Sequence, residues 1–370
     1  MDEHRDLWWE SPTRDRGRVV HLDFDGSFAF DRGGALVSIQ VSYESWGELN
    51  GARDNAVLVV HHLASDPHVA GEFDGGPRGW WEPLVGPGRA LDTDRYFVVC
   101  PNLIGGCYGT TGPRFPAPGD GEPYLDRFPL VTPRDMMRVQ RLFVNALGIE
   151  RLRLVVGPSM GGMVAWEWAV EDPQAAGRVA VIAAPVRSSP LQIGWNWLQR
   201  RSVEMDLDGG KVTGRAGQTV ARGVGMLSYR SPEGLSGKFG RDWFKEPGAT
   251  LAKPGTFNVE SWLRHHGRRI AARYDPYTYL LFSRAMDLHD LAAGRGSLED
   301  ALSGVTCPVR VVGISSDRLY PTDEMRFGAD TLRAAGGDVV YEEIESQNGH
   351  DAFLLDTVPI GAVLGKLLRD

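Results

Sequence analysis

The chain has 370 residues, of which 42% are hydrophobic, and its formal net charge is −8. This length suits one large α/β domain with an insertion or two domains, and the negative charge argues against nucleic acid or an anionic membrane as the main partner. No apolar stretch approaches the roughly 20 residues of a membrane span, residues 1–18 lack the apolar segment of a signal peptide, and the three cysteines are a sparse, odd set, so we expect a cytoplasmic location.

Strand and helix patterns alternate in the first half of the chain. Residues 17–24 and 35–45 alternate apolar and polar side chains, which predicts two antiparallel strands joined by a turn at residues 31–34. Continuous apolar runs predict buried strands at residues 56–61, 96–100, 152–156 and 179–183, and helical spacing predicts helices at residues 133–147 and 163–170. This order is typical of a mostly parallel, doubly wound sheet, whose sites lie at the carboxyl ends of the strands.

From about residue 186 to residue 305 the alternation stops. This stretch, which we call the lid, has helical spacing at residues 193–205, 217–229, 259–273 and 278–287. The alternation then resumes with strands predicted at residues 308–314 and 338–344 and helices predicted at residues 322–334 and 352–368. We therefore expect a helical insertion, residues 186–305, over an α/β core formed by residues 1–185 and 306–370.

A serine motif lies between the fifth predicted strand and the next helix. The segment Leu154–Met163 reads LVVGPSMGGM, an apolar strand that runs through Gly-x-Ser-x-Gly into helical spacing. Strand, tight turn and helix in this order are typical of a nucleophile elbow. Gly157 and Gly161 let the strand and the helix approach closely, and Ser159 stands at a helix N-terminus, which favours a developing oxyanion. We predict that Ser159 is a nucleophile.

A serine hydroxyl needs a neighbouring base, and in sheets of this kind the partners follow in the order serine, acid, histidine. Asp317 comes directly after the strand that ends at Ile314, and His350 follows the strand that ends at Ile344. Successive strand ends are where partners of Ser159 need to lie, so we predict a triad of these three residues.

Two other aspartates are rival acids. Asp351 adjoins His350, so its side chain would have to double back to reach the imidazole ring. Asp323 follows Pro321 and is typical of a helix-start residue. Asp317 remains the preferred acid.

The loop after the third predicted strand carries His61, His62 and His68. Their spacing matches no standard zinc pattern, so we predict no metal site. We expect the loop to supply a backbone N–H near Leu63 to an oxyanion hole, paired with the N–H of Met160.

Several segments together resemble one family, the homoserine O-acetyltransferases of the α/β-hydrolase superfamily. They are the elbow GPSMGGM, the contexts SSDRLYP and NGHDAFLLD of the predicted acid and base, and YESWGELN, GWWEPLVGPGRALDTDRYFVVCPN, GGCYGTTGP and SRAMDLHDL. The resemblance runs from about residue 41 to residue 356 and includes the lid. It implies an α/β-hydrolase fold with Ser159, Asp317 and His350 as the triad.

The resemblance also implies the substrates. The donor would be acetyl-CoA, a co-substrate, with no permanently bound cofactor, and the acceptor would be the hydroxyl of homoserine. Arg222 matches the arginine that holds the acceptor carboxylate, Tyr229 matches the tyrosine beside it, and Asp351 matches the acid that receives the ammonium group. Arg222 and Tyr229 are seven residues apart, two helical turns on one face. The family further implies a homodimer through the lid helices, and its pathway is methionine biosynthesis.

Three segments depart from the family pattern, and the first two of them leave the substrates open. The chain has HHLAS at residues 61–65 where the family usually has HALTG, GGCYG at residues 105–109 where it has GGCQG, and RHHG at residues 264–267 where YQG is commoner. The acceptor could be serine or a related hydroxy compound, and the donor could be succinyl-CoA. A serine esterase with the same triad is the rival enzyme, and a non-catalytic binding protein is the rival of another class. We expect a ping-pong acyl transfer through an acyl-serine.

Overall fold

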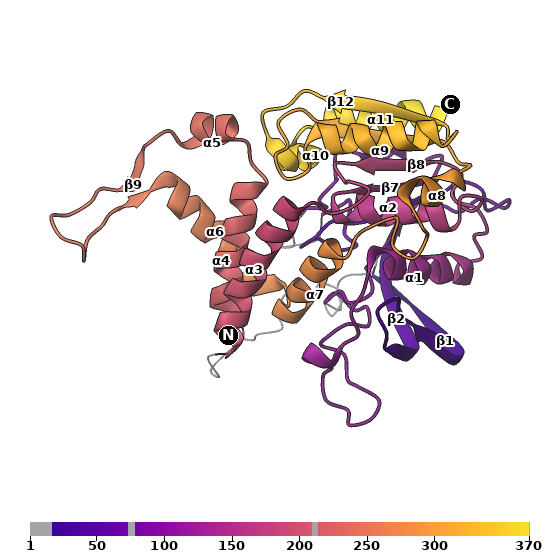
Figure 1. Cartoon of the computed structure of the whole chain (residues 1–370), viewed down its shortest axis with the longest axis horizontal. Coiled ribbons are helices and arrows are strands. Elements are labelled where there is room, and N and C mark those ends of the chain that lie inside the picture. The colour runs from indigo at the N-terminus through magenta and orange to yellow at the C-terminus, as the bar shows by residue number, and fades with distance from the viewer. Residues whose placement is uncertain (1–16, 73–77, 209–213, 370) are drawn as a thin grey trace.

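The computed structural model describes residues 17–72, 78–208 and 214–369 and is built on an eight-stranded sheet (Figure 1). In spatial order the strands are β1 (Arg18–Ala29), β2 (Ala35–Trp46), β6 (Phe97–Pro101), β3 (Ala56–Val59), β7 (Leu154–Pro158), β8 (Val179–Ile182), β11 (Val309–Ile314) and β12 (Val339–Ile344). The strands from β6 to β12 are parallel to one another, whereas β1, β2 and β6 pair antiparallel. The predicted antiparallel pair and the predicted mostly parallel sheet are both confirmed.

The predicted first strand ends too early. β1 continues five residues beyond Phe24, with a shift of register between Asp23 and Phe28. The extension carries aromatic rings that pack against one another, with centroids 5.9 Å apart for Phe24 and Phe28 and 5.1 Å apart for Phe28 and Phe30. Cross-strand and aromatic packing of this kind outweighs the break in the alternating pattern.

Helices cover both faces of the sheet, because its inner strands are apolar on both sides. In β3, Ala56 and Leu58 face one hydrophobic cluster, and Val57 and Val59 face the other. The first cluster is closed by α1 (Pro133–Ala146), α2 (Met160–Glu171), α8 (Leu298–Ser303) and α9 (Thr322–Ala334), and the second by α10 (Ala352–Leu355) and α11 (Thr357–Arg369). The predicted closing helix is therefore two helices.

Besides α8, which packs against the first hydrophobic cluster, the lid contains five helices in the described residues (Figure 1). They are α3 (Pro190–Asp208), α4 (Arg215–Ser228), α5 (Pro232–Phe239), α6 (Asn258–Arg273) and α7 (Pro276–Asp287). Four of these helices lie where helical spacing predicts them. The sequence analysis missed α5, α8 and the hairpin of β9 (Trp243–Lys245) and β10 (Thr256–Phe257). In this hairpin the rings of Trp243 and Phe257 stack at 3.7 Å.

The remaining elements are short. The strands β4 (Val85–Gly86) and β5 (Leu91–Asp92) pair with each other, and single 3-10 turns occupy Leu125–Arg127 and Gly349–Asp351. Within the described residues, no helix is long and apolar enough to cross a membrane.

The two ends of the lid lie side by side on the core. The N–H of Ser188 donates to the carbonyl of His289 at 2.9 Å, and the N–H of Leu291 donates to the carbonyl of Val186 at 3.0 Å. The His289 ring is buried, and its Nε2–H donates to the carbonyl of Pro185 at 2.8 Å. These bonds close the loop formed by the lid at a fixed place above the sheet.

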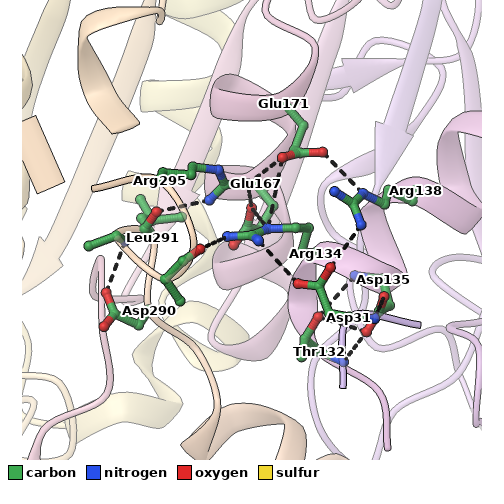
Figure 2. A network of polar contacts seen from close by, with 12 residues as sticks. Asp31, Thr132, Arg134, Asp135, Arg138, Glu167, Glu171, Asp290, Leu291 and Arg295 are labelled. Atoms are coloured by element: carbon green, nitrogen blue, oxygen red, sulfur yellow. Dashed lines mark hydrogen bonds and ion pairs between the residues drawn. The ribbon is translucent and has the colours of Figure 1, made fainter. Parts of the chain in front are cut away.

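Figure 2 shows a second attachment, a charge network that ties the segment after α7 to α1 and α2. The Arg295 guanidinium lies 2.6 Å from a carboxylate oxygen of Glu167 and 2.6 Å from one of Glu171, both on α2. Arg134, on α1, pairs with Asp31 at 3.1 Å and donates to the carbonyl of Ala293 at 2.6 Å. The network fixes the chain as it returns from the lid.

The buried His289 gives the protein a pH-dependent stability. Burial lowers the pKa of this imidazole to about 4 from its ordinary value of 6.5. Between pH 6.5 and pH 4, the imidazole is therefore protonated in the unfolded chain but neutral in the folded chain. Stability is lost as the pH falls from 6.5 to 4, by about 3 kcal/mol. We expect His289→Gln, which keeps a donor toward Pro185, to lose less unfolding free energy than the wild type over this interval in urea titrations.

The matched control is exposed His21→Gln. Equal slopes of unfolding free energy against pH for the wild type and His289→Gln would contradict the assignment.

Candidate active site

Ser159 lies in the tight turn between strand β7 and helix α2. It joins the end of β7 to the start of α2 with φ +56° and ψ −127°, a region that residues with a side chain rarely adopt. The bend requires glycine on both sides. A Cβ on Gly157 would lie 2.2 Å from the carbonyl oxygen of Gly161, and a Cβ on Gly161 would lie 2.2 Å from the carbonyl oxygen of Val60. The predicted turn is therefore present, with the Ser159 hydroxyl at its apex.

The structure brings the three predicted residues into one hydrogen-bonded line. His350 Nε2 lies 2.8 Å from Ser159 Oγ, and His350 Nδ1 lies 2.7 Å from Asp317 Oδ2. The other oxygen of Asp317 accepts the N–H groups of Leu319 and Tyr320 at 2.8 and 3.0 Å. With both oxygens held, the carboxylate fixes the orientation of the imidazole, and all three side chains are buried.

The two rival acids have other partners. Asp323 lies in the first turn of α9, where its carboxylate accepts the N–H of Glu324 at 3.0 Å. Asp351 forms an ion pair of 2.9 Å with Arg230. The geometry therefore selects Asp317 as the acid that holds the His350 ring.

Aromatic rings surround the imidazole of His350. The ring centroids of Tyr320, Phe353 and Tyr229 lie 4.9, 5.2 and 5.8 Å from that of His350. Burial raises the pKa of both tyrosines, so they stay neutral. We call the hydrogen-bonded set of Ser159, His350 and Asp317 the relay. The aromatic surroundings exclude water and strengthen each electrostatic interaction within it.

The loop after β3 packs against the start of α2, as the predicted oxyanion hole requires. The close approach of Gly161 to the carbonyls of Val60 and His61 places this loop beside the N-terminus of α2. Among the described residues, neither the N–H of Leu63, in the loop, nor the N–H of Met160, the first residue of α2, donates to another backbone carbonyl. Both amides are therefore available as donors.

Two residues from distant segments support this loop. Arg273, at the end of α6, lies 3.4 Å from the carboxylate of Asp66 and also donates to the carbonyl of Ala64. The same guanidinium donates to the hydroxyl of Tyr108 at 2.8 Å, and that hydroxyl donates to the Arg273 carbonyl at 2.8 Å. Two of the segments that depart from the family pattern, residues 61–65 and 105–109, thus meet at Arg273.

The three histidines of this loop have separate partners. His61 Nε2 accepts the N–H of Leu103 at 3.1 Å, His62 Nδ1–H donates to the carbonyl of Leu63 at 2.9 Å, and His68 pairs with Glu44 at 3.0 Å. In the part of the chain that the structure describes, no group of three or more His, Cys, Asp or Glu side chains could hold a metal ion.

The predicted acceptor-binding residues lie beside the relay. The Arg222 guanidinium lies 5.5 Å from the ring centroid of Tyr229, whose ring contacts His350. Among the described residues, no carboxylate lies within 4 Å of Arg222. Arg222 is therefore a half-buried cation without an ion-pair partner, one aromatic ring away from His350.

Sequence reasoning missed Arg230. Its ion pair with Asp351 spans more than a hundred residues of sequence, and its only local signal is its position directly after Tyr229. Burial raises the pKa of Asp351, and the positive charges of Arg230 and Arg222 oppose that rise. Asp351 is thus an acid that already has one positive partner.

Comparisons with known proteins agree with this geometry. Residues 55–357 match the family described as "alpha/beta hydrolase fold". The crystal structure of homoserine O-acetyltransferase from Bacillus anthracis superposes with a TM-score of 0.87 at 26% identity, covering 96% of this chain and 99% of that one. The structure of esterase E22 gives a TM-score of 0.85 at 24% identity over 95% and 99% of the chains and shows the shared fold. The protein is an α/β hydrolase by fold and site.

Relatives with about 40% sequence identity identify the family within the α/β hydrolases. Homoserine O-acetyltransferase of Moorella thermoacetica is 41% identical over 348 residues, which cover 92% of this chain and 93% of that protein. The homoserine O-acetyltransferase of Geobacter sulfurreducens is 42% identical over 341 residues, covering 90% and 92%. The chain belongs to the homoserine O-acetyltransferase family.

Proposed function

We propose that this enzyme transfers an acetyl group from acetyl-CoA to the hydroxyl of homoserine. The observation that carries the proposal is the arrangement of Ser159, His350 and Asp317 beside Arg222, a cation without a carboxylate partner. The relay supplies an activated serine, and a guanidinium is a natural bidentate partner for the carboxylate of an amino acid. Serine or a related hydroxy acceptor, and succinyl-CoA as donor, are the alternatives.

The first half-reaction forms an acyl-serine. His350 Nε2 takes the proton of Ser159 Oγ as this oxygen attacks the thioester carbonyl of acetyl-CoA. The N–H groups of Met160 and Leu63 stabilise the oxyanion. The C–S bond then breaks, and the thiolate of CoA leaves with the proton held by His350. Asp317 orients the ring and stabilises its charged form.

The second half-reaction regenerates the serine. The homoserine hydroxyl gives its proton to His350 Nε2 and attacks the carbonyl carbon of the acyl-serine. The bond to Ser159 Oγ breaks, and this oxygen takes the proton back, so that the products are O-acetylhomoserine and free enzyme. The same imidazole serves as base and then as acid in each half.

Transfer has to outcompete hydrolysis by water at roughly 55 M, and positioning of the acceptor supplies the advantage. Arg222 on α4 would hold the acceptor carboxylate, and Tyr229 would line the same side. Asp351 would receive the ammonium group while it remains paired with Arg230. The aromatic rings around His350 keep bulk water from the acyl-serine.

An esterase is the rival function, because the same relay hydrolyses an ester when water reaches it. Esterase E22 shares the fold at 24% identity. The unpaired Arg222 favours a transferase, since a hydrolase needs no group to hold the carboxylate of an amino-acid acceptor.

The dimer implied by the family is also a proposal. The lid helices α3 and α4 expose large apolar side chains, a feature typical of an oligomer interface. They are Leu191, Ile193, Trp197, Leu198, Met205, Val220 and Leu227. We propose that a second copy of the chain covers this surface.

The free state of all three cysteines supports the predicted cytoplasmic location.

Product analysis tests the proposed reaction. We expect the enzyme to convert acetyl-CoA and homoserine to O-acetylhomoserine, with release of CoA accelerated by homoserine, measured by mass spectrometry and a thiol assay. The control is Ser159→Ala, which removes the nucleophile and should lose activity by about 10⁴-fold or more. Release of CoA at one rate with and without homoserine would show an esterase. Faster transfer to serine, or from succinyl-CoA, would select an alternative substrate.

Substitution of Arg222 tests acceptor binding. Arg222→Lys keeps the charge but loses the bidentate geometry, and we expect kcat/KM for homoserine to fall about 10- to 100-fold. Because donor and acceptor react in separate steps, kcat/KM for acetyl-CoA should stay unchanged. Exposed Arg333→Lys on α9 is the matched control. A parallel fall of both specificity constants would show that Arg222 supports the fold or the relay instead.

A further inference from the structure

One part of the lid is strongly positive, although the whole chain carries −8. Residues 230–273 contain nine Lys and Arg residues against four Asp and Glu residues. This segment comprises α5, the β9–β10 hairpin and α6, which lie together at the end of the lid (Figure 1). Such a local excess creates a positive potential that attracts anionic ligands.

The positive groups gather around one indole ring. The ring centroid of Trp262 on α6 lies 5.2 Å from Lys238 Nζ on α5 and 5.8 Å from the guanidinium of Arg230. The His266 ring lies 4.9 Å away, one turn further along α6. Cation–π contacts of this kind hold flexible cationic side chains in place without neutralising their charge. Arg269 lies seven residues, or two helical turns, beyond Trp262 on α6. We call Arg230, Lys238, Trp262, His266 and Arg269 the Trp262 cluster.

Carboxylates do not neutralise the exposed cations of the cluster. Among the described residues, no carboxylate lies within 4 Å of Lys238 or Arg269, which are both exposed. The nearest acids in sequence have other roles: Glu260 accepts the N–H of Phe257 at the start of α6, and Glu233 lies 3.9 Å from Arg318. Two lid cations therefore keep their charge for a partner outside the chain.

His266 reports the same positive field. Partial burial and the neighbouring charges of Arg222, His265, Arg269 and Lys238 lower the pKa of this imidazole to about 4. The ring is neutral near pH 7 and adds polar groups rather than charge. Burial is the largest cause of this lowered pKa, and the neighbouring positive charges that add to it would attract an anion placed beside the ring.

The Trp262 cluster is joined to the loop that carries His350. Arg230 forms the 2.9 Å ion pair with Asp351, the residue after His350. The N–H of Asp351 donates to the carbonyl of Tyr229 at 3.3 Å, and the Ser231 hydroxyl donates to the carbonyl of Gln347 at 2.5 Å. The Trp262 cluster thus lies on the lid segment that packs against the His350 loop.

We propose that the Trp262 cluster binds the phosphate groups of the acyl-CoA donor. The inference rests on the proposed function, in which a CoA thioester delivers its acyl group to Ser159. Lys238 and Arg269 attract the phosphates, and Trp262 holds the Lys238 ammonium group in place. Arg230 links the site to Asp351. The phosphates carry most of the donor's charge and lie far from the thioester carbon, so their binding positions the pantetheine arm toward the relay.

A comparison of two donors tests this site. One donor is acetyl-CoA, and the other is the acetyl thioester of N-acetylcysteamine, which has the same reactive bond but no phosphate. We expect K238M/R269M to lower kcat/KM for acetyl-CoA about 10- to 100-fold and to leave kcat/KM for the truncated thioester within about twofold. Lys366→Met, which removes an exposed charge on α11 of the core, is the matched control. Wild-type kcat/KM for acetyl-CoA should fall with added salt, and the double variant should lose this dependence.

Binding of CoA itself, measured by calorimetry, separates this inference from the proposed reaction. We expect wild-type protein to bind CoA more tightly than pantetheine, and K238M/R269M to bind the two with similar affinity. If the enzyme fails to acetylate homoserine but this preference is present and depends on the cluster, the site stands and the proposed reaction fails. An equal loss with both donors, or an unchanged preference for CoA in the variant, would overturn the site. Tighter binding of free phosphate than of CoA would show a site for another anion.

Discussion

The backbone bend at Ser159 is the constraint on which the rest of the site depends. A residue with φ +56° and ψ −127° is strained, and the strain persists only because the surrounding structure fixes it. Close contacts of Gly157 and Gly161 with neighbouring backbone leave no room for a side chain at either position. The bend directs the hydroxyl toward His350 and sets the N-terminus of α2 beside the loop after β3. The nucleophile Ser159 and the predicted oxyanion donor Met160 thus belong to one strand–turn–helix unit, which meets His350 and the loop after β3.

In the proposed reaction, the lid directs the triad toward acyl transfer rather than hydrolysis. Its ends are joined by backbone hydrogen bonds near His289, and the segment that leaves it is tied to α1 and α2 by paired charges. The lid therefore places its functional groups reproducibly over the core. Arg222 lies over the ring of Tyr229, and the Trp262 cluster lies on the segment that contacts the His350 loop. One insertion would in this way hold both the acceptor and the donor in the proposed reaction.

The sequence predicted what depends on local pattern and missed what depends on contacts between distant residues. The apolar runs of β3, β7 and β11 and the GPSMGGM turn carry their structure in their own residues, so the sheet, the elbow and the positions of Asp317 and His350 could be predicted. The early end of β1 was wrong, because aromatic packing continues the strand. The helix α5 and the hairpin were missed, because short elements rich in glycine and charge have little periodicity. The pair of Arg230 with Asp351 joins residues more than a hundred positions apart, and no spacing rule finds it.

The covalent step is the central claim, and trapping the intermediate tests it most directly. Enzyme mixed with acetyl-CoA without acceptor, quenched in acid and digested, should carry one acetyl group on the peptide that contains Ser159. Addition of homoserine before the quench should remove this group and yield O-acetylhomoserine. Formation of O-acetylhomoserine without any acetyl group on Ser159, both in the wild type and in a slowed Asp317→Asn variant, would contradict an acyl-serine intermediate.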